Sequence, residues 1–250
     1  MERITYTETL RCLDADCDFR AQLKPSALLR YVEQASADHA RARGMDRRFF
    51  QEHYSAFLVA KQAVQITRMP GQAELLTLTT ACETFQKGSM KRITTLTDAD
   101  GALLALVDSR WMLVDTRTGR IRRAPDWNVP GFQNESLPEE LPQLVHKSKE
   151  LTEAGTWTAR YSLCDRNGHI NNSIYLDIAC DALPPEVWQG SVLRGFSIKY
   201  HREVPLGERV QVLAAPVEQG WYVLGRRKEH AAFECYLELG PAVEEANRKN

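Results

Sequence analysis

Hydrophobic and polar positions divide the chain into two halves with the same predicted order of elements. In the first half, a strand-like segment at residues 4–13 precedes residues 25–43, where apolar side chains recur at helical spacing. Pro25 suits the first turn of this helix, and Gly44 suits its end. The face predicted to be buried carries Leu28, Leu29, Val32, Ala35 and Ala42, and the opposite side carries Ser36 and Asp38.

Strand patterns fill the rest of each half. Alternating apolar and polar residues predict strands near residues 56–68, 73–85, 91–98 and 103–115. The second half repeats the order, with a strand near 156–163, a helix near 172–182, and strands near 192–202, 209–217, 220–228 and 231–239. Residues 124–150 are rich in Pro, Glu and Asn and are predicted to be a linker. A strand, a helix and an antiparallel meander are the plan of the hotdog fold, so we expect an α+β chain with two hotdogs.

A short residue frame also recurs between the halves. An acid, an apolar residue and a serine occupy matching positions in residues 18–26 and 165–173. Asn167 and His169 have no counterpart in the first half. One half is therefore predicted to carry chemistry that the other lacks, unless so short a match is a coincidence.

A polar loop precedes the helix predicted in the second half. Asp165, Asn167 and His169 occupy every second position, and in an extended segment such residues point the same way. We therefore expect these three side chains in one pocket. The following residues, 171–173, suit a helix N-terminus, where a carbonyl or an anion can be held. The alternative is an ordinary turn and helix cap with no catalytic role, since Asp and Asn side chains make both.

This loop resembles the signature of the acyl-acyl carrier protein thioesterases, Asp-x-Asn-x-His-(Val/Ile)-Asn-Asn-x-x-Tyr. Residues 165–175 match it at every fixed position. Residues 196–204 look like the Tyr-Arg-Arg-Glu-Cys segment of that family, with Glu203 at its catalytic glutamate and Val204 at its cysteine. Residues 29–35 and 111–115 are similar to its first helix and to its Trp-Val-Met-Asp strand.

The resemblance implies a tandem hotdog that forms a single-chain pseudo-dimer. Residues 1–123 would be the N-terminal hotdog, which binds the acyl chain and lacks the catalytic motif. Residues 124–150 would be the linker, and residues 151–250 the catalytic hotdog. The implied reaction is hydrolysis of fatty acyl-acyl carrier protein to free fatty acid, without a cofactor.

The resemblance implies four catalytic residues, Asp165, Asn167, His169 and Glu203. Glu203 is the candidate general base, because a partly desolvated carboxylate has a raised pKa suited to proton abstraction. Asn167 could orient the water or donate to the carbonyl, His169 could donate to the oxyanion, and Asp165 could fix the loop. The alternative for Glu203 is a surface ion pair with Arg202 or Lys199.

A nucleophilic cysteine is not expected. Val204 cannot supply a thiol, which favours attack by water. Cys164 is next to the loop, but in a strand it would point away from Asp165. We therefore predict that Cys164 is a packing residue. Tyr175 is likewise predicted to pack in the core.

The implied partner is an acyl carrier protein, which is acidic and calls for local basic residues. Docking candidates are Arg120, Arg122, Arg123, Arg194, Lys199, Arg202, Arg226, Arg227 and Lys228. Candidate substrate-binding residues are Leu28, Leu29, Val32, Asn171, Asn172 and Arg202. The sequence leaves the acyl chain length and a homodimer open.

Composition and charge narrow the class of protein further. The net charge of -1 argues against nucleic acid as a partner, and no apolar run predicts membrane insertion. The charged residues 1–8 do not form a signal or transit peptide, so a cytoplasmic protein is expected. Six cysteines without a Cys-x-x-Cys pair do not predict a metal site.

Three alternatives remain open at the level of sequence. An acyl-CoA thioesterase of the same fold would share the site but not the carrier. A hotdog hydratase or dehydratase also uses a histidine and a carboxylate, although the Asn-rich loop fits it less well. A non-catalytic acyl-binding module would bind the acyl group without turnover.

Overall fold

The computed structural model describes residues 3–242. The chain divides into two compact units, with the boundary after Gln143. The predicted domain limits also include residues 1–2 and 243–250, which lie outside the described residues.

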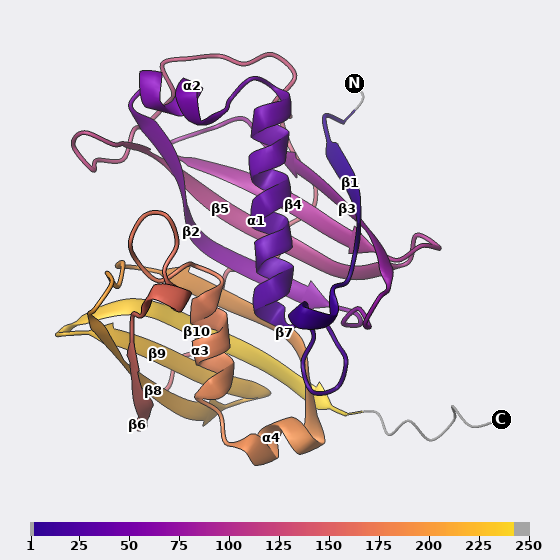
Figure 1. Ribbon diagram of the computed structural model, residues 1–250, viewed down its shortest axis with the longest axis vertical. Coiled ribbons are helices and arrows are strands. Elements are labelled where there is room, and N and C mark those ends of the chain that lie inside the picture. The colour runs from indigo at the N-terminus through magenta and orange to yellow at the C-terminus, as the bar shows by residue number, and fades with distance from the viewer. Residues whose placement is uncertain (1–2, 243–250) are drawn as a thin grey trace. The chain divides into compact units, whose positions relative to one another are not determined.

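The first unit combines an antiparallel sheet with one long helix (Figure 1). Its elements are β1 (Tyr6–Arg11), the 3₁₀ turn η1 (Asp14–Asp16), α1 (Pro25–Ala42), α2 (Arg47–Glu52), β2 (Ser55–Ile66), β3 (Leu75–Cys82), β4 (Ser89–Thr97) and β5 (Leu103–Asp115). The strands lie in the order β1-β3-β4-β5-β2, and each neighbouring pair is antiparallel. Helix α1 lies across one face of this sheet and contacts β1 and β3.

The second unit has the same plan. Its elements are β6 (Thr152–Thr158), the 3₁₀ turn η2 (Tyr161–Leu163), α3 (Ile174–Asp181), α4 (Pro185–Gly190), β7 (Ser191–Tyr200), β8 (Arg209–Val217), β9 (Gly220–Arg227) and β10 (His230–Pro241). The strands lie in the order β6-β8-β9-β10-β7, again antiparallel throughout. Read along the chain, this order equals that of the first unit, so the predicted repeat of elements is confirmed.

Helix α1 begins and ends where the sequence predicts. Pro25 is its first residue, and Gly44 follows it with φ +81°, a conformation that glycine adopts without strain. Leu28, Leu29 and Val32 are fully buried. Full burial of each such side chain stabilises the fold by about 1.5–3 kcal/mol.

Two predictions for α1 are wrong. Ala42 is exposed, whereas Ser36 is buried. The Ser36 hydroxyl donates to the Val32 carbonyl at 2.7 Å, so its burial leaves no unpaired polar group. The buried face then continues through His39, which is 1% exposed.

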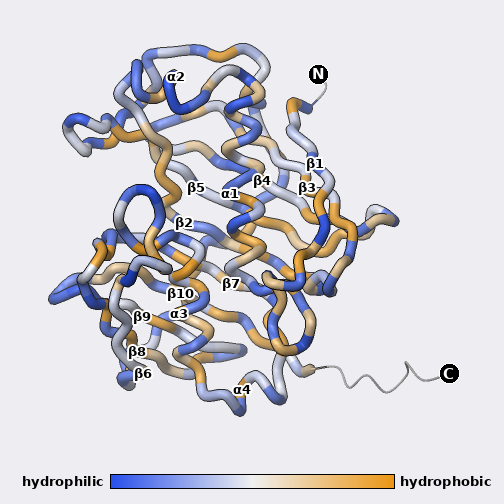
Figure 2. Tube along the Cα trace, in the orientation of Figure 1, coloured by the Kyte–Doolittle hydropathy of each residue, from blue (hydrophilic) through white to orange (hydrophobic). Residues whose placement is uncertain are grey.

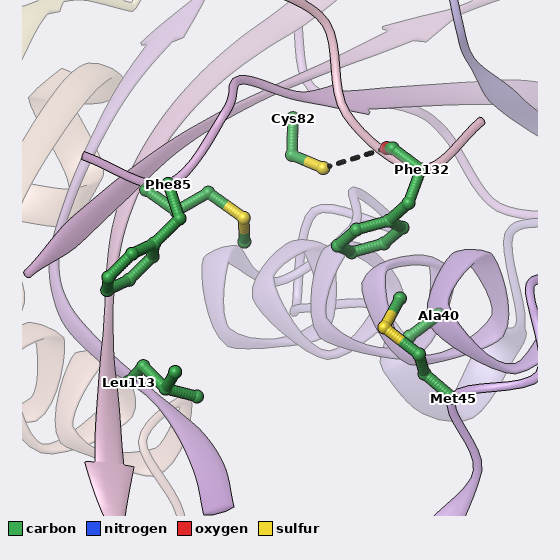
Figure 3. Packing of buried hydrophobic residues seen from close by; sticks show 7 residues of the cluster. Ala40, Met45, Cys82, Phe85, Leu113 and Phe132 are labelled. Carbon is green, nitrogen blue, oxygen red and sulfur yellow. Dashed lines mark hydrogen bonds between the residues drawn. The ribbon is translucent and has the colours of Figure 1, made fainter. Parts of the chain in front are cut away.

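The core of the first unit includes a segment that the sequence predicts to be a linker. Phe132 is 1% exposed and packs in a cluster with Met45, Cys82 and Phe85 (Figure 3). The Cys82 thiol donates to the Phe132 carbonyl at 3.2 Å. The chain up to residue 143 thus packs on the first unit after β5 ends.

The remaining differences from the predicted elements are local. Helices α2 and α4 have six residues each, too short to show a periodic pattern. The Asp46 side chain caps α2 by accepting from the Phe49 N–H at 2.9 Å. Strand β6 ends at Thr158, and residues 161–163, which are predicted to belong to this strand, form η2 instead. Figure 2 shows that both hydrophobic and hydrophilic residues occur along the strands.

Candidate active site

The loop between η2 and α3 is a tight turn and not the extended segment predicted. The Gly168 N–H donates to the Asp165 carbonyl at 3.0 Å, and the Asp165 N–H donates to the His169 carbonyl at 3.0 Å. Gly168 has φ +80°, which a residue with a Cβ rarely adopts. The loop is mainly hydrophilic (Figure 2). The polar residues at every second position therefore belong to a turn, in which the side chains of Asp165 and Asn167 face each other.

The Asp165 carboxylate organises this turn. It accepts the Asn167 backbone N–H at 2.8 Å and the Asn167 Nδ2 at 3.1 Å. A carboxylate only accepts, so the amide nitrogen of Asn167 must face it. The amide oxygen and the second N–H of Asn167 then point away from Asp165, toward solvent, where Asn167 is exposed.

His169 lies next to Glu203, which belongs to the segment that follows β7. The distance from His169 Nε2 to Glu203 Oε1 is 3.5 Å, and the side chains are 14% and 63% exposed. In the described part of the chain, Glu203 forms no ion pair with Arg202 or Lys199. The structure therefore brings together a histidine and a carboxylate that lie far apart in the sequence.

The hydrogen bonds of His169 define its tautomer. Its Nδ1 lies 3.1 Å from the Ile170 carbonyl oxygen, which only accepts, so Nδ1 carries the proton. In the neutral ring, Nε2 is then an acceptor that faces the Glu203 carboxylate, a second acceptor. Either a water that donates to both atoms or a proton on Nε2 resolves this conflict. The oxyanion-donor role expected for His169 requires the doubly protonated ring.

Three backbone contacts fix the segment that carries Glu203. The Val204 carbonyl accepts the Ile170 N–H at 3.0 Å, and the Val204 N–H donates to the Tyr175 hydroxyl at 3.2 Å. Arg227 Nη1 donates to the Glu203 carbonyl at 3.2 Å. The glutamate is thus tied to the loop, to α3 and to β9.

Tyr175 both packs and anchors. It is 3% exposed, and its ring centroid lies 5.0 Å from that of Phe233. Burial raises the pKa of its phenol, so the hydroxyl stays neutral. The core-packing role predicted for Tyr175 is confirmed, and its contact with Val204 was not visible in the sequence.

The start of α3 is satisfied within the loop. Asn171 Oδ1 accepts the Ser173 N–H at 2.9 Å and the Ser173 hydroxyl at 2.7 Å. The Ile174 N–H donates to the Asn171 carbonyl at 3.0 Å. The Asn171 side chain therefore forms a turn just before α3 and does not cap the helix itself, and the Ser173 and Ile174 N–H groups are already in use. Asn172 is half-buried, and its side chain makes no hydrogen bond to the described residues.

Neither position 204 nor Cys164 is suited to supply a nucleophilic thiolate. Val204, at the position of the family cysteine, is fully buried. Cys164 pairs with Ile170 at the base of the loop. Burial, with a smaller effect of Asp165, raises the pKa of the Cys164 thiol, which lowers the fraction of nucleophilic thiolate.

Several of the other candidate residues belong to the first unit. Leu28, Leu29 and Val32 belong to the first unit, where they are fully packed. Arg122, a docking candidate, is paired with Asp115 at 2.7 Å. Within residues 3–242, no three His, Cys, Asp or Glu side chains are grouped to hold a metal ion.

The first unit contains a loop with the same backbone. The Asp18 N–H donates to the Gln22 carbonyl at 2.7 Å, as the Asp165 N–H donates to that of His169 at 3.0 Å. Each loop also contains a turn closed by a hydrogen bond of 3.0 Å: residue 21 donates to the carbonyl of residue 18, and residue 168 donates to that of residue 165. The repeated frame predicted from the sequence is therefore a structural repeat.

The two loops differ in chemistry. Gln22 occupies the position of His169. In the first unit, the N–H of residue 23 donates to the carbonyl of residue 70, which follows β2, at 2.8 Å. In the second unit, the N–H of residue 170 donates to the carbonyl of residue 204 in the same way, at 3.0 Å, so residue 70 is equivalent to residue 204. Met69 therefore occupies the position of Glu203. The first unit retains the scaffold without the histidine and the carboxylate.

Two hotdog units, one of which carries the Asp, Asn, His and Glu set, define a tandem hotdog protein. Family models match most of the chain: the acyl-ACP thioesterase N-terminal domain at residues 4–129 and the acyl-ACP thioesterase C-terminal domain at residues 146–242. The chain belongs to the acyl-ACP thioesterase family.

Individual proteins agree with this membership. A chloroplastic acyl-[acyl-carrier-protein] hydrolase of Cuphea viscosissima is 23% identical over 213 residues, which are 78% of this chain and 50% of that protein. The chain thus spans about half the length of this curated relative. A crystal structure of an acyl-ACP thioesterase from Bacteroides thetaiotaomicron has a TM-score of 0.86 at 21% identity and covers 94% of this chain and 98% of its own. The 12:0-ACP thioesterase of Umbellularia californica has a TM-score of 0.77 at 16% identity, with 97% and 99% coverage. These structures show the tandem hotdog fold.

Among the described residues, no helix combines the length and the apolar character needed to cross a bilayer.

Proposed function

We propose that this chain hydrolyses the thioester of fatty acyl-acyl carrier protein and releases free fatty acid and the carrier thiol. Family membership and the pairing of His169 with Glu203 at 3.5 Å support this reaction. The pairing is the observation that carries the proposal, because the first unit keeps the same loop without either residue.

Glu203 is the general base in this proposal. A water molecule donates one hydrogen to Glu203 Oε1 and the other to His169 Nε2, which satisfies both acceptors. Its lone pair then points away from both side chains, toward the carbonyl carbon of the thioester. Glu203 removes one proton as the carbon–oxygen bond forms, a step in which a positioned base contributes about 10²–10⁴-fold.

The asparagines stabilise the oxyanion. Asp165 holds one N–H of Asn167, so the second N–H of the same amide is free to donate to the carbonyl oxygen. Asn172, whose side chain makes no hydrogen bond to the described residues, is a second donor. The tetrahedral intermediate then breaks the carbon–sulfur bond, and the proton on Glu203 passes to the departing thiolate.

The two units divide the work in this proposal. Residues 151–250 carry the catalysis, residues 1–123 bind the acyl chain, and residues 124–150 connect them. Leu28, Leu29 and Val32 are fully packed, so an acyl chain reaches them only when neighbouring side chains move. The expected cytoplasmic location stays a prediction.

Release of free thiol from acyl carrier proteins of different chain lengths tests the function. We expect turnover by the wild type and loss of turnover in His169→Ala. Gln22→Ala is the matched control, because it removes the equivalent side chain from the loop without chemistry, and it should retain wild-type turnover. Thiol release from acyl-CoA but not from acyl carrier protein would show that acyl-CoA is the substrate. No thiol release from either substrate would refute the proposed hydrolysis.

A further inference from the structure

A small basic pocket lies beside the Glu203 segment in the second unit. It has a volume of about 280 Å³ and is lined by Arg202, Arg227, Lys228 and His230. We call these four residues the Arg202 pocket. Sites for drug-sized ligands are mostly apolar and span about 300–1,000 Å³, so this pocket suits a small anionic group and not an acyl chain.

The structural repeat shows that Arg202 has lost a partner. Its equivalent in the first unit, Arg68, donates to both oxygens of Glu74, at 2.9 and 2.7 Å. Glu208 occupies the position of Glu74, because residues 74 and 208 make the same backbone hydrogen bonds to residues 12 and 159. In the second unit, however, Glu208 does not bind Arg202.

Arg227 takes that carboxylate instead. Its Nη2 donates to Glu208 Oε1 at 2.6 Å, and its Nε contacts the other oxygen. A bidentate pair of this kind neutralises the guanidinium and holds it in place. Arg202 and Lys228 have no hydrogen bond or ion pair from their side chains within residues 3–242. Two positive charges in the pocket are thus uncompensated.

The pocket is also coupled to the site. Arg227 Nη1 donates to the carbonyl of Glu203 at 3.2 Å, and Arg202 is the residue directly before Glu203. An anion bound by Arg202 and Lys228 would therefore sit next to the segment that carries the general base. An anion in this position fits a charged group of the substrate that is separated from the reacting carbonyl.

We propose that the Arg202 pocket binds the phosphate of the 4′-phosphopantetheine arm that carries the acyl thioester. This inference rests on the proposed function, since that arm presents the thioester in acyl carrier protein and in CoA alike. Arg presents a planar set of donors to phosphate, and Lys adds a point charge. The pantetheine chain separates sulfur from phosphate, so the phosphate contacts these cations while the carbonyl faces Glu203 and His169.

Two synthetic substrates that differ by one phosphate test the proposal. We compare hydrolysis of acyl-pantetheine and acyl-4′-phosphopantetheine by the wild type and by the Arg202→Gln/Lys228→Gln double variant. We expect KM for the phosphorylated substrate to rise about tenfold in the variant, and KM for acyl-pantetheine to stay unchanged. Arg209→Gln removes an exposed charge next to Glu208 and outside the pocket, and it should change neither value.

Equal changes of KM for both substrates, or no change for either, would overturn the assignment. Acyl carrier protein and acyl-CoA should both lose affinity in the double variant. A loss confined to the carrier would assign these cations to its acidic surface and contradict phosphate binding.

A binding readout separates this inference from the proposed function. 4′-Phosphopantetheine, without an acyl group, should raise the thermal midpoint of the wild type more than pantetheine does, and the double variant should abolish the difference. If this holds in a protein that hydrolyses no thioester, the proposed function fails and the phosphate site stands. If thioesters are hydrolysed and both compounds give the same midpoint, the phosphate site fails and the proposed function stands.

Discussion

His39 should make the protein sensitive to mild acid. The side chain lies on α1 and is 1% exposed, with its Nδ1 3.1 Å from Arg92 Nη1. A guanidinium only donates, so Nδ1 must accept and the ring is held neutral. Burial first, and then the charges of Arg92 and Arg43, lower the pKa of His39 from 6.5 to about 4.

The sign and size of the effect follow from this pKa. The unfolded chain binds a proton near pH 6.5, which the folded state resists until about pH 4. Stability is therefore complete above pH 6.5 and falls as the pH drops between these values. Linkage gives a loss of about 2 kcal/mol between pH 7 and pH 5. For a chain of this size, the loss corresponds to a decrease of about 4–8 °C in thermal midpoint.

Urea unfolding of the wild type and His39→Gln at pH 7 and pH 5 measures this term. Glutamine can still accept from Arg92 but does not titrate, so the variant should lose about 2 kcal/mol less than the wild type over this range. His230→Gln, at an exposed position, is the control and should behave as the wild type. An equal loss in the wild type and in His39→Gln would refute the assignment of acid sensitivity to this ring.

Three further outcomes are expected. Cys164→Ser should hydrolyse the thioester at a rate within about twofold of the wild type, because the Cys164 thiol takes no part in the reaction. A decrease of more than about tenfold would indicate that Cys164 is a nucleophile. Tyr175→Phe leaves the buried Val204 N–H unpaired, so it should lower the free energy of unfolding by about 1–3 kcal/mol and reduce kcat; unchanged stability would contradict this contact. Burial acts to raise the pKa of Glu234, but hydrogen bonds from Lys147 and two other side chains outweigh it and lower the pKa to about 2. Stability from this carboxylate is present above pH 4.5 and is lost toward pH 2, so Glu234→Gln should flatten the acid limb of urea unfolding below pH 4.5.

The order of elements and the helix α1 could be predicted because they depend on local periodicity. Apolar spacing, Pro25 and Gly44 all agree on where α1 lies, and short-range rules of this kind survive folding. Ser36 shows the limit. Its burial depends on a hydrogen bond to the preceding turn, which no hydropathy pattern records.

The catalytic loop shows a second limit. Alternation and turn formation compete for the same residues, and an Asp two residues before Asn-Gly favours the turn. Asp165 therefore binds Asn167 and does not project beside it from a strand. The approach of Glu203 to His169 spans more than thirty positions, so its distance follows from sheet register and could be expected only from the family resemblance.

The most direct test of the catalytic proposal is the steady-state rate of Glu203→Gln on the preferred acyl carrier protein substrate. Glutamine keeps the size of the side chain and removes its basicity. We predict that kcat falls by about 10²–10⁴-fold while KM stays close to that of the wild type, because the base acts in the transition state. A variant that turns over at nearly the wild-type rate would contradict the assignment of Glu203 as the base that activates water.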